Sequence, residues 1–192
     1  MGDIRVETLP FMESERLRWR TGHDEMLLNS EASPFLKRVL ARKHAVRPKK
    51  FFGEAFVASH WPHHDGYYSS AKWLTSKRWT GSDALDAEDA AELKKALARH
   101  FPKLEQFQAT VAAFADAHQG VKPVAPDLWL IVNGQHQFIE VKLAKDELAE
   151  HQFAGLALIA RCLPSEAPVS VILVNLDNTA AQFAKYADQL PL

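Results

Sequence analysis

The clearest structural signal in the chain is Pro126–Gln152, PDLWLIVNGQHQFIEVKLAKDELAEHQ. It contains two runs rich in β-branched, aromatic and other apolar residues, Leu128–Val132 and Gln135–Val141. Asn133-Gly134 separates the runs, and an Asn-Gly pair in this position is the strongest short-range signal for a β-hairpin because both residues tolerate positive φ. The stretch therefore predicts two antiparallel strands joined by a two-residue turn.

The turn also determines which residues face each other across the hairpin. If the Asn-Gly pair forms the loop, Val132 faces Gln135, and counting outward from there puts Asp127 opposite Glu140. A four-residue loop centred on the same pair keeps this register, whereas a three-residue loop shifts it by one residue. Lys142 lies two positions beyond Glu140 and so shares its face of the sheet. The register thus predicts two carboxylates and an ammonium on one face.

Two opposed carboxylates are unfavourable for a sheet that only has to fold. Like charges placed directly opposite each other are destabilising, and the surrounding face is apolar, with Trp129 expected opposite Phe138. A divalent cation removes the repulsion, since carboxylate oxygens beside phosphate oxygens are a usual site for Mg²⁺. The Lys142 ammonium would orient a water and stabilise charge on a transferring phosphoryl group. Asp127, Glu140 and Lys142 therefore predict a phosphodiester hydrolase that uses Mg²⁺ or Mn²⁺; the alternative is a set of solvated charges in which Lys142 neutralises Glu140.

These residues resemble the signature of a nuclease superfamily. Pro126-Asp127, a hairpin and then Glu140-Val141-Lys142 look like the PD-(D/E)XK pattern. The closer similarity is to the VRR-NUC branch, in which PDL and a spacer are followed by EVK, a polar stretch with Asp and Leu, and a Gln on the next helix. Asp146, Leu148 and Gln152 stand in register with that pattern.

The resemblance spans about residues 120–176 and implies a restriction-endonuclease-like core and Mg²⁺-dependent hydrolysis of DNA, of the endonuclease type. It also implies that the carbonyl of Val141 joins Asp127 and Glu140 as a metal ligand. One departure is Leu143-Ala144, where the branch usually has Gly-Pro. This departure concerns the local loop and not the metal ligands.

Gln152 also lies where helical spacing predicts burial, on one face with Leu148, Gly155 and Ile159. Because burying an unpaired amide costs about 1–3 kcal/mol, Gln152 needs a partner. The family has this position near the active site, so Lys142, a water or a DNA phosphate is the expected partner. A hydrogen-bonded core glutamine is the alternative.

Such families also supply a glutamate from an early helix as a metal ligand or base. Glu54 is our choice, because it lies among apolar residues and follows a glycine that permits close approach. Glu105, on the helix before the hairpin, is the rival, although its neighbours Gln106 and Gln108 indicate a solvated face. The expected catalytic residues are Asp127, Glu140, Lys142, Glu54 and Gln152, and the expected metal ligands are Asp127, Glu140, Val141 and Glu54.

The order of elements predicts an α/β fold, with a mixed sheet of about four strands flanked by helices and a mostly helical N-terminal half. Residues 1–34 read as an irregular arm with one short helix, and Trp61–Gly66 reads as a loop. A further strand is expected at Val169–Leu176, because it is apolar along most of its length. Periodicity, prolines and capping residues predict helices at Ser14–Arg20, Pro34–Arg42, Pro48–Ser59, from a cap at Ser82 or Asp83 to Arg99, Lys103–His118, from a cap at Asp146 to about Arg161, and Thr179–Gln189.

We expect these elements to divide into an N-terminal arm and helix over residues 1–45 and a nuclease-like domain over residues 46–192. A helical hairpin at about residues 82–119 would be an insertion in that domain.

Charge is divided unevenly between the two halves of the chain. Residues 1–80 contain fourteen Lys and Arg and nine Asp and Glu, a balance of +5; residues 81–192 contain nine and fifteen, a balance of -6. Basic residues interleaved with aromatic ones neutralise phosphates and stack on bases, so the basic half predicts DNA as the partner. A solvated helical face over core aromatics is the alternative. The expected nucleic-acid-binding residues are Lys49, Lys50, Lys72, Lys77 and Arg78.

The composition indicates in which cellular compartment the protein is expected. A single cysteine, Cys162, excludes an internal disulfide and a thiolate cluster, which favours a reducing compartment. The first thirty residues lack the apolar segment of a secretory signal, and the longest apolar stretches are too short to cross a membrane. We therefore expect a soluble cytoplasmic protein without a membrane partner, with a homodimer left open.

Other functions are less well supported by the sequence. His60, His63 and His64 with Asp65 form a weak zinc pattern, because cysteines and helical His-x-x-x-His spacing are missing. Solvated or phosphate-contacting histidines are the alternative to zinc ligands. Two rivals to the nuclease are a non-catalytic nucleic-acid-binding domain on the same scaffold and an interaction subunit whose basic half contacts an acidic partner.

Overall fold

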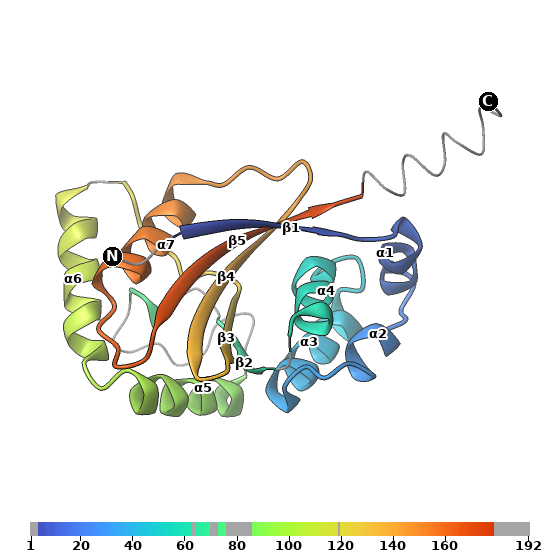
Figure 1. Ribbon diagram of the computed structural model, residues 1–192, viewed down its shortest axis with the longest axis horizontal. Coiled ribbons are helices and arrows are strands. Elements are labelled where there is room, and N and C mark those ends of the chain that lie inside the picture. The colour runs from blue at the N-terminus through green and yellow to red at the C-terminus, as the bar shows by residue number, and fades with distance from the viewer. Residues whose placement is uncertain (1–3, 63, 70–72, 76–85, 119, 179–192) are drawn as a thin grey trace.

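The computed structural model describes residues 4–62, 64–69, 73–75, 86–118 and 120–178 (Figure 1). These residues form the predicted α/β fold, with a five-stranded mixed sheet flanked by helices. The strands are β1 (Ile4–Pro10), β2 (Asp65–Tyr68), β3 (Leu128–Val132), β4 (Gln135–Leu143) and β5 (Val169–Asp177). The helices are α1 (Glu13–Arg20), α2 (Glu25–Leu28), α3 (Pro34–Val46), α4 (Phe52–His60), α5 (Ala87–His100), α6 (Leu104–Ala117) and α7 (Glu150–Cys162). None of the described helices has both the length and the apolar character that crossing a membrane requires.

The sheet has the strand order β1-β5-β4-β3-β2, with β1 and β4 parallel to β5, and β3 antiparallel to both β4 and β2. The predicted hairpin is confirmed in position and register, since Val132 pairs with Gln135 and Trp129 with Phe138. Asn133 and Gly134 have φ of 50° and 77°, as the tight turn requires. Leu128 pairs with Ile139 at the start of β3, so Asp127 and Glu140 occupy the next facing position.

Both edge strands were missed by the sequence prediction. The irregular arm is wrong at Ile4–Pro10, because β1 pairs in parallel with β5. The loop predicted at Trp61–Gly66 runs into β2, which begins at Asp65. Ile4–Glu7 of β1 does alternate apolar and polar residues, but the run is short and Val6 is 63% exposed. β2 has only four residues, which is too few for a clear periodic signal.

Helices cover both faces of the sheet beside β4. Glu140 and Val141 are consecutive in this strand, so their side chains point to opposite faces. Gly53 of α4 lies over Val141, where a Cβ would come within 2.9 Å of the Val141 Cγ1 atom. Gln152 of α7 hydrogen-bonds to Glu140 on the other side. The end of β4 is therefore held between α4 and α7.

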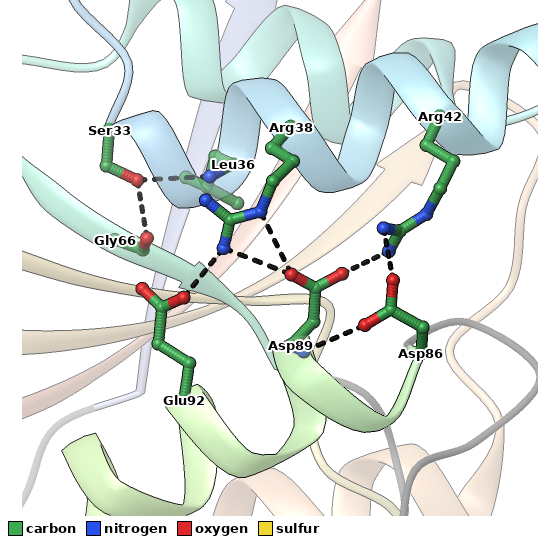
Figure 2. A network of polar contacts seen from close by, with 8 residues as sticks. All are labelled: Ser33, Leu36, Arg38, Arg42, Gly66, Asp86, Asp89 and Glu92. Atoms are coloured by element: carbon green, nitrogen blue, oxygen red, sulfur yellow. Dashed lines mark hydrogen bonds and ion pairs between the residues drawn. The ribbon is translucent and has the colours of Figure 1, made fainter.

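An ionic network joins α3 to α5 (Figure 2). Asp89 of α5 is 2% exposed and accepts hydrogen bonds from Nε of Arg38 at 3.0 Å and from Arg42. Asp86 caps α5 by accepting from the Asp89 N–H at 2.9 Å, and it also accepts from Arg42 at 2.5 Å. Glu92 accepts from Arg38 at 2.7 Å. These contacts fix the N-terminal helices against the helix that follows them in the second half of the chain.

Three helices begin later than predicted. α5 begins at Ala87, after a cap at Asp86, and not after a cap at Ser82 or Asp83. α4 begins at Phe52 and not at Pro48, because Phe51 has a left-handed backbone (φ 64°) through which a helix cannot continue. α7 begins at Glu150, because the Asp146 carboxylate accepts a hydrogen bond from the Leu143 N–H at 3.1 Å instead of capping the helix.

The helical hairpin predicted at about residues 82–119 is also not formed. Figure 1 shows α5 and α6 meeting at a corner, not lying side by side. The predicted cap residues Ser82 and Asp83 and the predicted helix Thr179–Gln189 lie outside the described residues. The division at residues 45 and 46 stays a prediction, although β1 from the first segment belongs to the same sheet as β5.

Candidate active site

A cavity of about 390 Å³ opens at the end of the hairpin, beside the first turn of α4. It is lined by every residue in the predicted catalytic set and by side chains of α1 and the segment before α4. The lining residues are Arg16, Arg20, Lys49, Lys50, Phe51, Phe52, Gly53, Glu54, Asp127, Glu140, Val141, Lys142, Leu143, Asp146 and Gln152. Segments far apart in the chain thus share one cavity.

Glu140, Lys142 and Gln152 form a closed set of hydrogen bonds. The Lys142 ammonium donates to Glu140 Oε1 and to Gln152 Oε1, both at 2.8 Å. The Gln152 amide donates from Nε2 to the same Glu140 oxygen at 2.6 Å. Gln152 Oε1 also accepts a hydrogen bond from the Ala149 N–H at 3.1 Å, so this side chain also helps to cap the N-terminus of α7. The arrangement holds Lys142 and Glu140 in fixed positions although both are almost fully buried.

Asp127 approaches the same place from β3. Its Oδ2 accepts a hydrogen bond from the Val141 N–H at 2.9 Å, which locks its side chain across the hairpin. These hydrogen bonds involve Oδ2 of Asp127 and Oε1 of Glu140. The second oxygen of each carboxylate takes no part in them.

The three carboxylates are shielded from solvent and influence one another electrostatically. Burial, followed by repulsion from Asp127, raises the pKa of Glu140 to about 7, against the opposing effect of Lys142. The same two causes raise the pKa of Glu54 to about 8. Burial also raises the pKa of Asp127, although the Val141 N–H and Lys142 act in the opposite direction. The raised pKa values mean that ionising all three carboxylates together is unfavourable, and that a further positive charge would favour their ionised forms.

This donor set fits a hard divalent cation by its chemistry. Mg²⁺ and Mn²⁺ prefer carboxylate and carbonyl oxygens, and a buried excess of carboxylate charge is stabilised by such an ion. The side chains are not already arranged for coordination. In the described part of the chain, no three His, Cys, Asp or Glu residues form a group that could hold a metal. Glu54, Asp127 and Glu140 would have to close around the ion.

Of the two glutamates considered for the early-helix role, the cavity contains Glu54 and not Glu105. Glu54 lies in the first turn of α4 and interacts electrostatically with Asp127 and Glu140. Glu105 lies on α6 and lines a different cavity with Phe101 and Gln108.

The predicted nucleic-acid-binding and zinc residues are only partly visible. Lys49 and Lys50 are exposed and line the cavity, whereas Lys72, Lys77 and Arg78 lie outside the described residues, as does His63. His60 and His64 each turn Nδ1 toward a main-chain carbonyl, of Phe56 and Pro62 respectively.

Lys43 is a site residue that the sequence did not single out. Its Nζ lies 4.1 Å from the ring centres of both Phe51 and Tyr68, so the ammonium is held between two aromatic faces. Burial lowers the pKa of Lys43 to about 8, while nearby Glu54 and Asp127 act to raise it. Only the tertiary fold brings this cation beside the carboxylates, because Lys43 lies on α3, Phe51 just before α4 and Tyr68 on β2.

No family model matches the chain, and comparisons with curated proteins and with solved structures also found no match. The function is therefore argued from the cavity and from the motif that its residues form.

Proposed function

We propose that this protein is a metal-dependent nuclease that hydrolyses phosphodiester bonds in DNA, with an active site of the PD-(D/E)XK type most similar to the VRR-NUC branch. The observation that carries the proposal is the convergence of Asp127, Glu140, Lys142, Gln152 and Glu54 on one cavity. These residues come from three separate elements and from the position just before β3. A need to fold alone does not explain one buried and two partly buried carboxylates in one place.

Asp127, Glu140 and Glu54 would hold Mg²⁺ or Mn²⁺, with the Val141 carbonyl that the motif implies. When bound, the ion would lower the pKa of a coordinated water and neutralise charge on the phosphate. Lys142 has three N–H donors, and its bonds to Glu140 and Gln152 use two of them. The third is suited to orient the attacking water or to donate to a phosphate oxygen. Gln152 fixes the direction of the ammonium.

The direct test is cleavage of plasmid DNA by the purified protein in the presence of Mg²⁺. Wild type should nick or cut the plasmid, and Lys142→Ala should abolish cutting with little change in circular dichroism. Lys142→Met, which keeps most of the side-chain volume, should behave in the same way. Lys145→Ala is the matched control, because Lys145 is an exposed lysine three residues away.

Wild-type activity in Lys142→Ala, or no cleavage by wild type with either metal, would contradict the proposal. If DNA binding falls steeply with salt but no metal supports cleavage, the protein is a non-catalytic nucleic-acid-binding domain on the same scaffold. Absence of both DNA and metal binding would favour an interaction subunit.

A further inference from the structure

The mouth of the active-site cavity is basic where its floor is acidic. Arg16 and Arg20 of α1 line it, together with Lys49 and Lys50 of the segment before α4. The two arginines are four residues apart and therefore lie on the same face of α1. We call these four residues the cationic rim.

Buried contacts hold the two halves of the cationic rim together. Trp19, 1% exposed, donates a hydrogen bond from its indole nitrogen to the Lys50 carbonyl at 2.7 Å. The Trp19 ring also stacks on His44 of α3, with ring centres 3.9 Å apart. Ahead of α1, Phe11 packs against Phe52 with ring centres 5.1 Å apart. α1 is thus fixed beside the start of α4. The rim residues are therefore carried by segments that are packed into the fold, and not by a loose arm.

The positive charges of Arg16 and Arg20 are only weakly neutralised by carboxylates of the described residues. Arg16 lies 3.7 Å from Glu13, and both side chains are substantially exposed, so this pair is weak. Arg20 forms no ion pair within the described part of the chain. Guanidinium groups bind phosphate oxygens through paired N–H donors, and a row of them suits a polyanion better than a single small anion.

We infer that Arg16 and Arg20, acting with Lys49 and Lys50, bind the sugar-phosphate backbone of DNA and hold one strand over Asp127 and Glu140. This inference rests on the proposed nuclease function, because it names the surface that presents the substrate to that site. It gives α1 a role in substrate binding, where the sequence indicated only a short helix in an arm.

Arg18 provides a control on the same helix. It is exposed, faces another cavity of about 500 Å³, and lies 3.6 Å from Glu25. Arg18→Ala removes the same charge as either rim substitution and leaves the rim in place.

The test is the affinity for a fluorescently labelled DNA duplex, measured by anisotropy over a range of salt concentrations with Ca²⁺ in place of Mg²⁺. Each phosphate contact contributes about 0.9 to the slope of log affinity against log salt. The double variant Arg16→Ala/Arg20→Ala should therefore have a slope shallower by about two and bind at least about tenfold more weakly at low salt. Arg18→Ala should match wild type, and Arg16→Lys/Arg20→Lys should keep most of the slope, which also guards against a folding defect in the alanine variant.

Three results would overturn the inference: an unchanged slope in the alanine double variant, an equal loss in Arg18→Ala, or no binding of the duplex by wild type. Failure of the nuclease proposal looks different. In that case wild type binds the duplex with the rim-dependent slope, but plasmid stays intact in Mg²⁺ and Mn²⁺.

Discussion

Gln152 makes contacts on three sides, to Glu140, to Lys142 and to the Ala149 N–H. Replacing it with alanine removes the amide that aims Lys142 and also one capping bond of α7. We expect Gln152→Ala to lower the cleavage rate about 10–100-fold, as losses of orienting groups around metal sites do, and to lower the free energy of unfolding by about 1–2 kcal/mol. Plasmid cleavage and urea denaturation measure the two effects.

His151→Ala is the neighbouring control for Gln152→Ala, because the His151 side chain is exposed. A cleavage rate for Gln152→Ala within twofold of wild type would mean that Lys142 needs no orienting amide.

The raised pKa values of Glu54 and Glu140 predict how stability depends on pH in the absence of metal. An unfolded glutamate titrates near 4.3, so between that pH and about 7 the folded protein holds more protons than the unfolded chain. The stabilisation is complete below the unfolded pKa and is lost as pH rises. We therefore expect Tm in EDTA to fall from pH 5 to pH 7.5, a window chosen to lie below the pKa of Lys43, which is about 8.

Two comparisons check the origin of this pH effect. Glu54→Gln should flatten the fall of Tm, because the amide cannot ionise, and Mg²⁺ should reduce it in wild type by stabilising the ionised carboxylates. A Tm in EDTA that rises over the same pH range would contradict the assignment of buried, repelling carboxylates.

At the scale of elements, the contact between α3 and α5 depends on Asp89 (Figure 2). Asp89→Ala removes a buried carboxylate from Arg38 and Arg42, whose side chains are 47% and 41% exposed and can be hydrated in its absence. We expect a loss of about 1–3 kcal/mol, below the cost of stranding a fully buried charge. Glu92→Ala, at an exposed pair with Arg38, should cost less than about 1 kcal/mol. Equal Tm values for the two variants would contradict this account.

Elements with strong local signals were predictable from the sequence. The hairpin of β3 and β4 was correct in position and register because Asn133-Gly134 fixes the turn and the turn fixes the facing pairs. β5 was found because it is apolar along its length and lies inside the sheet. β1 and β2 were missed because both are edge strands with short signals: the alternation of β1 covers only Ile4–Glu7, and β2 has only four residues.

Most of the candidate site was predictable from the contiguous motif Pro126–Gln152, and Glu54, outside that motif, was chosen from its apolar neighbours and the glycine before it. The rim arginines reach the cavity, and Lys43 reaches Phe51 beside it, through packing of α1 and α3 on the rest of the fold, and no local spacing encodes that. Phe51 shows a related limit, because its left-handed backbone and its contact with Lys43 depend on the tertiary structure. Helical periodicity alone therefore placed the start of α4 too early.

At the scale of the whole molecule, the first and last described strands lie side by side at one end of the sheet, β1 against β5. The N-terminal segment supplies this strand and, through α1, one wall of the cavity. The middle of the chain supplies the hairpin and α7. The candidate site is thus a property of the complete fold, and we expect its metal affinity to be lost with the tertiary structure.

Asp127 and its neighbours are proposed to hold a divalent cation, and calorimetric titration with Mn²⁺ measures that binding. Asp127→Asn is the informative variant, because its amide oxygen can still accept from the Val141 N–H and so preserve the hairpin. Asp116→Asn, at an exposed position on α6, is the control. We predict that wild type and Asp116→Asn bind Mn²⁺ and that Asp127→Asn binds at least about tenfold more weakly. No binding by wild type, or equal affinity in Asp127→Asn, would contradict the account.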